Sequence, residues 1–112
     1  VAQIGFAQPD VSKCGGITEM VRIAALASAF GVLLCPHSAT TPLNFAASIH
    51  VLSAVDNPGW FEADASPVNP FRDQLCSKAY VLDDDGAVRP LERPGIGVDI
   101  DEDMVMGNLI AG

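Results

Sequence analysis

The first half of the chain alternates short apolar runs with longer segments of helical spacing. Residues 2–7 predict a short strand, and the unbroken apolar run at 32–35 is typical of a parallel strand covered on both faces. Between them, residues 17–30 have high helix propensity and precede Gly31, which stands where a helix C-cap is expected. We therefore predict a parallel β/α/β unit. An apolar stripe of the helix should lie on its sheet: Met20, Ile23, Ala24, Ala27 and Phe30.

The same pattern then repeats. Residues 44–55 are a mixture of small and apolar side chains and predict a second helix. After the turn at 57–59, residues 60–62 predict a third strand, and residues 65–73 predict a proline-containing loop.

The last third of the chain has a different pattern. Residues 79–82 and 87–90 predict an antiparallel hairpin around the Asp-Asp-Asp-Gly turn at 83–86. We therefore expect two parts, with the β/α units in residues 1–76 and the hairpin and tail in residues 77–112. The acidic stretch near the end of the tail is interpreted as a solvated face.

Composition suggests that the helices and strands need neighbours. Of the 112 residues, 49% are hydrophobic and 18% are charged, against about 25% charged in typical soluble domains. A small set of parallel strands with such apolar faces needs covering on both sides.

Charge and cysteine content exclude several classes of function. The net charge is −8, and the six Lys and Arg residues are scattered, so we expect no nucleic-acid partner. The longest apolar stretch, residues 23–35, is short of the roughly 20 residues that a membrane helix needs, and no membrane partner or secretion signal is predicted. Three cysteines without paired spacing favour neither disulfides nor zinc, and indicate a reducing cytoplasm.

Asp10 and His37 each follow one of the predicted strands, 27 residues apart. A β/α crossover of about thirty residues returns the chain to the same sheet edge, and in barrels that edge carries the chemistry. A carboxylate beside an imidazole accepts the Nδ1 proton and leaves Nε2 as the base. We therefore expect Asp10 and His37 to form a proton-transfer dyad, with Glu62 at the equivalent end of the third strand.

Six motifs, in this order and spacing, make nearly the whole chain resemble the enolase superfamily, specifically the C-terminal barrel region of the mandelate racemase subgroup. The motifs are Gln8-Pro9-Asp10, Gly15-Gly16-Ile17-Thr18-Glu19, Pro36-His37, Phe61-Glu62, Asn69-Pro70 and Pro94-Gly95-Ile96-Gly97. The resemblance implies an α/β fold comprising about strands six to eight of a (β/α)7β TIM-like barrel. The C-terminal hairpin and tail would pack toward a capping domain that this chain lacks.

The resemblance also implies chemistry. His37 would be the general base or acid that moves the proton α to a substrate carboxylate, Asp10 would orient it, and Glu62 would hydrogen-bond the enediolate. The expected cofactor is Mg²⁺, held by carboxylates on preceding strands, so the chain would be a fragment of a longer enzyme. The expected activity is dehydration of a small-molecule sugar acid, an aldonate or aldarate, by a homo-oligomeric protein.

Other readings stay open. The same dyad could serve a racemase or epimerase, and the chain could instead be a noncatalytic module that stands alone. A histidine after a proline is, by itself, more often structural, but the spacing from Asp10 and the resemblance favour catalysis for His37. His50, inside the second predicted helix, is interpreted as structural.

Overall fold

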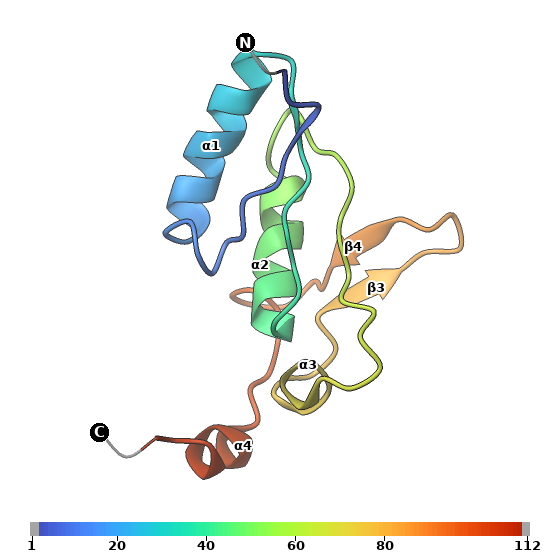
Figure 1. The fold of residues 1–112 in the computed structure, drawn as a ribbon. Helices are drawn as coiled ribbons and strands as arrows, with labels where there is room; N and C mark the ends of the chain where they lie inside the picture. Colours follow the sequence, from blue (N-terminus) through green and yellow to red (C-terminus); the bar gives the residue numbers. More distant parts are fainter. Residues whose placement is uncertain (1–2, 111–112) are drawn as a thin grey trace.

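The first unit of the fold is a parallel strand pair connected by a helix. The computed structural model describes residues 3–110, so Ala2, which we placed in the first strand, lies outside the described residues. Strand β1 (Phe6–Ala7) pairs in parallel with β2 (Leu33–Leu34). Helix α1 (Ile17–Ala29), labelled in Figure 1, connects them. The predicted β/α/β unit is confirmed, although both strands are shorter than expected.

Helix α1 ends where the sequence predicted, but its apolar stripe is only partly covered. The C-cap is Phe30, and Gly31 follows with a φ of 67°, which suits glycine after a helix end. Met20 and Ala24 are buried, whereas Phe30 is 78% exposed. The prediction that Phe30 lies on a sheet is wrong in this structure, because the paired strands are only two residues long and end short of it.

Helix α2 (Pro42–Leu52) is the most buried element of the described chain. It begins two residues earlier than predicted, because Thr41 caps it by accepting a hydrogen bond from the amide of Asn44 and Pro42 suits the first turn. It also ends earlier, at the C-cap Ser53. One buried cluster joins α2 to α1 and β2: Val11, Met20, Ala24, Leu34, Ala47 and Val51.

The third predicted strand, residues 60–62, does not form. The chain just before this segment meets β2 through a single parallel bridge between Leu34 and Pro58, and the Gly59 amide donates to the Leu34 carbonyl at 2.8 Å. The ladder cannot continue along β2, because Pro36 has no amide hydrogen to donate. Residues 60–62 therefore follow the sheet edge as irregular chain.

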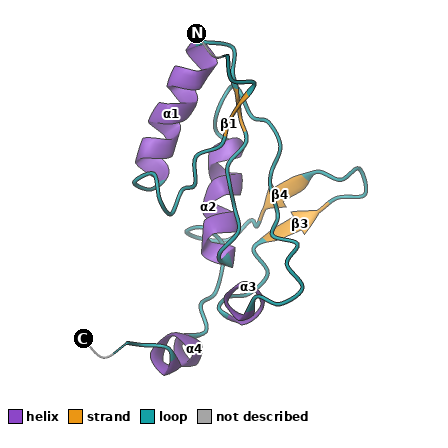
Figure 2. Ribbon diagram, viewed as in Figure 1, coloured by secondary structure: helices purple, strands orange, loops and turns teal. Residues whose placement is uncertain are grey.

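The second half contains the predicted hairpin and two helices that the sequence reading missed. Strands β3 (Tyr80–Leu82) and β4 (Val88–Pro90) pair antiparallel around the expected turn (Figure 2). The predicted proline-containing loop includes α3 (Pro70–Gln74), and the acidic stretch forms α4 (Glu102–Gly107). Both helices have an Asn or Asp N-cap, and acidic residues in the first turn of α4 complement its positive end.

An aromatic cluster attaches the hairpin to α2. The ring of Phe61 lies 6.0 Å from that of Phe45 in α2 and 5.4 Å from that of Tyr80 in β3, both edge to face. Ala46, Ala79, Ile96 and Val98 complete this second cluster. The cluster joins residues from both expected parts, and the division at residue 76 stays a prediction.

The described chain is more open than a self-contained domain of its size. Its radius of gyration is 15.0 Å, against about 13 Å for a compact domain of this length. Its accessible surface is 7277 Å², against roughly 5,900 Å² for a folded monomer of this mass. Part of the excess is apolar, since Ile4, Leu26 and Phe30 are largely exposed around a groove of about 730 Å³ beside β1 and α1. None of the described helices could cross a membrane.

Candidate active site

His37 and Glu62 form a direct contact at the edge of the parallel unit. The Nδ1 atom of His37 lies 2.7 Å from Glu62 Oε2, and the amide of Ser38 donates to the same oxygen at 3.2 Å. Both side chains are about half exposed, at 42% for His37 and 47% for Glu62. A carboxylate that accepts the Nδ1 proton leaves Nε2 as the basic nitrogen, on the side of the ring away from Glu62.

Asp10 does not make the hydrogen bond that we expected. Among residues 3–110, no hydrogen bond joins Asp10 to His37. Glu62 occupies the position beside Nδ1, because the carboxylate of Asp10 is held by other donors. The prediction of an Asp10–His37 hydrogen bond is therefore wrong in this structure, while the roles of the three residues stay predictions.

Asp10 is buried and bound from several sides. Its Oδ1 accepts hydrogen bonds from the Ser12 amide at 2.8 Å, the Ser12 hydroxyl at 2.5 Å and Asn44 Nδ2 at 2.7 Å. The ammonium of Lys13 lies 2.9 Å from Oδ2, as an ion pair without hydrogen-bond geometry. Burial raises the pKa of Asp10, but the contacts from Ser12 and Lys13 outweigh it and lower that pKa from 3.8 to about 2.

Backbone hydrogen bonds explain why Asp10 and His37 lie at the same sheet edge although no hydrogen bond joins their side chains. The Cys35 amide donates to Ala7 O at 2.8 Å, and the His37 amide donates to Pro9 O at 3.0 Å. The loops that carry Asp10 and His37 are thus hydrogen-bonded to each other immediately beyond the sheet. The strand-end argument from the sequence correctly placed both loops on one edge.

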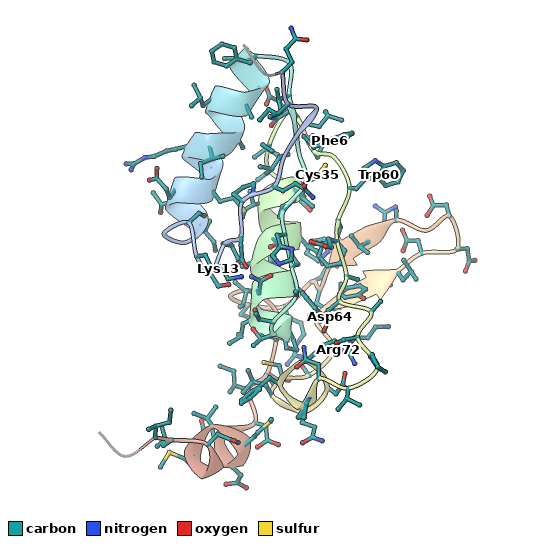
Figure 3. The ribbon with its side chains drawn as sticks, in the orientation of Figure 1. Phe6, Lys13, Cys35, Trp60, Asp64 and Arg72 are labelled. Atoms are coloured by element: carbon teal, nitrogen blue, oxygen red, sulfur yellow. The ribbon has the colours of Figure 1, made fainter. Side chains whose placement is uncertain are left out.

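The sequence reading missed a polar clamp that holds the loop after Glu62. Asn69 caps α3 and donates to the Thr40 carbonyl, just beyond His37, and to Asp64 at 2.8 Å. Arg72, which is partly buried, donates to the Asp64 carbonyl and contacts its carboxylate (Figure 3). Hydrogen bonds from Asn69 and Ser66 lower the pKa of Asp64 from 3.8 to about 2. The signal was present in Asn69-Pro70, which is a helix N-cap followed by proline.

A small cavity of about 190 Å³ opens beside Glu62. Figure 3 labels three of its residues: Phe6 in β1, Cys35 directly after β2, and Trp60 in the segment that follows the Leu34–Pro58 bridge. Its lining comprises Phe6, Gln8, Cys35, Trp60, Phe61 and Glu62. The cavity is mainly aromatic and apolar, with the Glu62 carboxylate as its one ionisable group apart from the Cys35 thiol.

The described residues do not provide a site for Mg²⁺. Within residues 3–110, no three His, Cys, Asp or Glu side chains come close enough together to hold a metal ion. Asp10 is paired with Lys13, and Glu62 with His37. The expectation that carboxylates on preceding strands hold Mg²⁺ stays a prediction.

Comparison with known proteins decides the family. Residues 2–104 match the model of the enolase C-terminal domain-like family. The chain belongs to this family. The enolase C-terminal domain is part of a TIM barrel, which accounts for the parallel β/α unit and for the exposed apolar surface beside it. The numbering of the strands as six to eight stays a prediction.

The relatives of this enolase-type chain are much longer than the chain itself. It is 42% identical over 108 residues to D-galactonate dehydratase of Xanthomonas oryzae pv. oryzae, covering 91% of this chain and 28% of that protein. The enzyme of the same name from Ralstonia pickettii is 37% identical over 111 residues, with 92% and 28% covered. The chain therefore spans between a quarter and a third of these curated relatives.

Solved structures agree with the family assignment. An enolase superfamily member from Polaromonas sp. JS666 superposes with a TM-score of 0.84 at 47% identity, covering 93% of this chain and 27% of that one. The 3,6-anhydro-D-galactonate cycloisomerase from Zobellia galactanivorans gives a TM-score of 0.82 at 33% identity, covering 96% and 30%. Both neighbours are enolase superfamily or sugar-acid enzymes by name.

Proposed function

We propose that this chain is the C-terminal barrel portion, about strands six to eight, of a Mg²⁺-dependent enzyme that dehydrates a sugar acid. The observation that carries the proposal is the contact of His37 Nδ1 with Glu62, since it prepares Nε2 to exchange a proton with substrate. Similarity to the D-galactonate dehydratases supports an aldonate or aldarate as the substrate class. Mg²⁺, bound by ligands outside this chain, would polarise the substrate carboxylate.

The residues of this chain would handle the proton. His37 Nε2 takes the proton α to the carboxylate, or delivers a proton to the departing β-hydroxyl, according to the configuration of the substrate. Loss of the α proton and of the β-hydroxyl together releases one water molecule and leaves an enol that tautomerises to the 2-keto acid. Glu62 would hydrogen-bond the enediolate oxygen that carries the developing charge, with Oε1 as the donor while Oε2 accepts from His37 Nδ1. Asp10 supports His37 through the hydrogen bond between their loops.

A racemase or epimerase is the second candidate. A mandelate racemase/muconate lactonizing enzyme-like protein from Roseovarius sp. TM1035 superposes with a TM-score of 0.79 at 30% identity, covering 96% of this chain and 26% of that one. Proton exchange at the α carbon without loss of water would distinguish this activity from dehydration. The noncatalytic module is the third candidate, and it requires that the chain be stable and monodisperse alone.

The test is turnover of a sugar-acid panel, including D-galactonate, by the complete enzyme with Mg²⁺. Replacing His37→Asn should lower kcat by about 10²-fold or more, because general acid–base groups contribute on that scale. The matched control is His50→Asn, since His50 lies in α2 and the hydrogen bonds found for residues 3–110 do not join it to Asp10, His37 or Glu62. Equal activity of the two variants would exclude His37 as the catalytic base or acid.

Three further features are part of the proposal. We expect a homo-oligomer with a small-molecule substrate and no nucleic-acid or membrane partner, in keeping with the net charge of −8. The cytoplasm is the proposed compartment, and Cys14, Cys35 and Cys76 are all free thiols. Size-exclusion chromatography of the complete enzyme tests the oligomer.

A further inference from the structure

Asn44 is a buried side chain that the proposed mechanism does not use. It is 3% exposed and lies in the first turn of α2. Two of the three hydrogen bonds to Asp10 Oδ1 come from Ser12, two residues further along the chain, and form a local turn. The third, from Asn44 Nδ2 at 2.7 Å, comes from 34 residues away. Asn44 is thus the tertiary contact that orients the Asp10 carboxylate relative to α2.

A second polar residue on the same face of α2 reaches the other loop of the site. Ser48 lies one helical turn beyond Asn44, so both side chains point the same way. Its hydroxyl contacts the hydroxyl of Ser38, next to His37, at 3.2 Å, and both serines are fully buried. One helix therefore holds the Asp10 loop through Asn44 and the His37 loop through Ser48.

The amide of Asn44 carries a cost in stability beside its hydrogen bonds to Asp10 and Ser12. Its Oδ1 is buried without a hydrogen-bond partner among residues 3–110, a situation that costs about 1–3 kcal/mol. A leucine of similar volume would avoid that cost while Ser12 and Lys13 still contacted Asp10. Asn44 Nδ2 also donates to the Ser12 hydroxyl at 2.9 Å, so the amide binds the whole Asp10 turn.

We propose that Asn44 is a positioning residue that fixes the Asp10 carboxylate, and with it the loop hydrogen-bonded to His37, in the geometry needed for proton transfer. The inference deepens the proposed function and rests on it for its catalytic part. Asn44 does not touch substrate; it acts through Asp10. Of the side chains that contact Asp10, Lys13 is charged, and Asn44 and Ser12 are neutral.

The experiment compares Asn44→Leu with Asn57→Leu in the complete enzyme. Asn57 is a matched control, because it is also buried. Within the described part of the chain, its Oδ1 also lacks a partner, and its Nδ2 donates only to the backbone carbonyls of Ala24 and Val32. We expect Asn44→Leu to lower kcat by about tenfold or more with little change in KM, because small misplacement of catalytic groups is costly. At temperatures where it is folded, Asn57→Leu should leave kcat within about twofold, since its lost contacts are remote from the reacting atoms. Equal effects on kcat would overturn the proposal.

A second readout does not depend on turnover. The carboxyl carbon of Asp10, followed by NMR, should titrate at a higher pH in Asn44→Leu than in the parent, and unchanged in Asn57→Leu. If the parent turns over no sugar acid but this shift is present, the proposed function fails and the positioning contact stands. Absence of the shift overturns the contact itself. Should Asn44→Leu not fold, Asn44→Ser takes its place, because the shorter side chain is polar but cannot reach Asp10 to make the hydrogen bond.

Discussion

Gly59 lies where the segment leading to Glu62 crosses β2, and we predict that Gly59→Ala destabilises the enzyme. A Cβ atom there would overlap Cys35 Sγ and approach the Leu34 carbonyl oxygen to 3.0 Å. Overpacking of this kind costs about 1–3 kcal/mol. The Gly59 amide also donates to Leu34 O at 2.8 Å, and loss of that bond adds about 0.5–1.5 kcal/mol. The expected loss of unfolding free energy is therefore about 1.5–4.5 kcal/mol.

Denaturant unfolding of the complete enzyme measures this loss, and a double variant locates its cause. Removing the sulfur with Cys35→Ala should partly relieve Gly59→Ala, so that the two changes couple by about 1 kcal/mol in a double-mutant cycle. The Leu34 carbonyl remains in place and prevents full recovery. A loss below about 0.5 kcal/mol for Gly59→Ala would refute the reasoning, since surface substitutions without a packing conflict fall in that range. Strict additivity with Cys35→Ala would show that the sulfur is not the obstacle.

Two other predictions concern charge and surface. Because the pKa of Asp10 is lowered from 3.8 to about 2, its ionised form stabilises the fold by about 2 kcal/mol above pH 4. That stabilisation is lost as the pH falls from about 4 through 2. The difference in unfolding free energy between the parent and Asp10→Asn should therefore shrink over this pH range. A difference that stays constant would contradict the prediction. The isolated 112-residue chain should self-associate through its exposed apolar groove, and Leu26→Lys with Phe30→Lys should reduce association in sedimentation analysis. A monodisperse parent chain would instead support the stand-alone module.

Local patterns in the sequence were sufficient for helices α1 and α2, for the hairpin, and for placing the loops of Asp10 and His37 at one sheet edge. Gly31 marked the end of α1, because a glycine readily adopts the positive φ found there. The hairpin turn followed from Gly86, which has a φ of 82°. The prediction of a third strand was wrong, because the pattern at 60–62 could not reveal that Pro36 stops β2 from continuing the ladder. Helix α3 was missed because its five residues are too few for periodicity to register.

The sequence by itself determined which chemical groups stand at the ends of consecutive β/α segments, since strand length and crossover length are properties of the local chain. It therefore placed Asp10 and His37 on adjacent, hydrogen-bonded loops. Only the tertiary structure decided that Glu62, and not Asp10, contacts His37, and that Asn44 binds Asp10 from 34 residues away. Those choices depend on side-chain direction and on competing donors, which leave no periodic signal in the sequence.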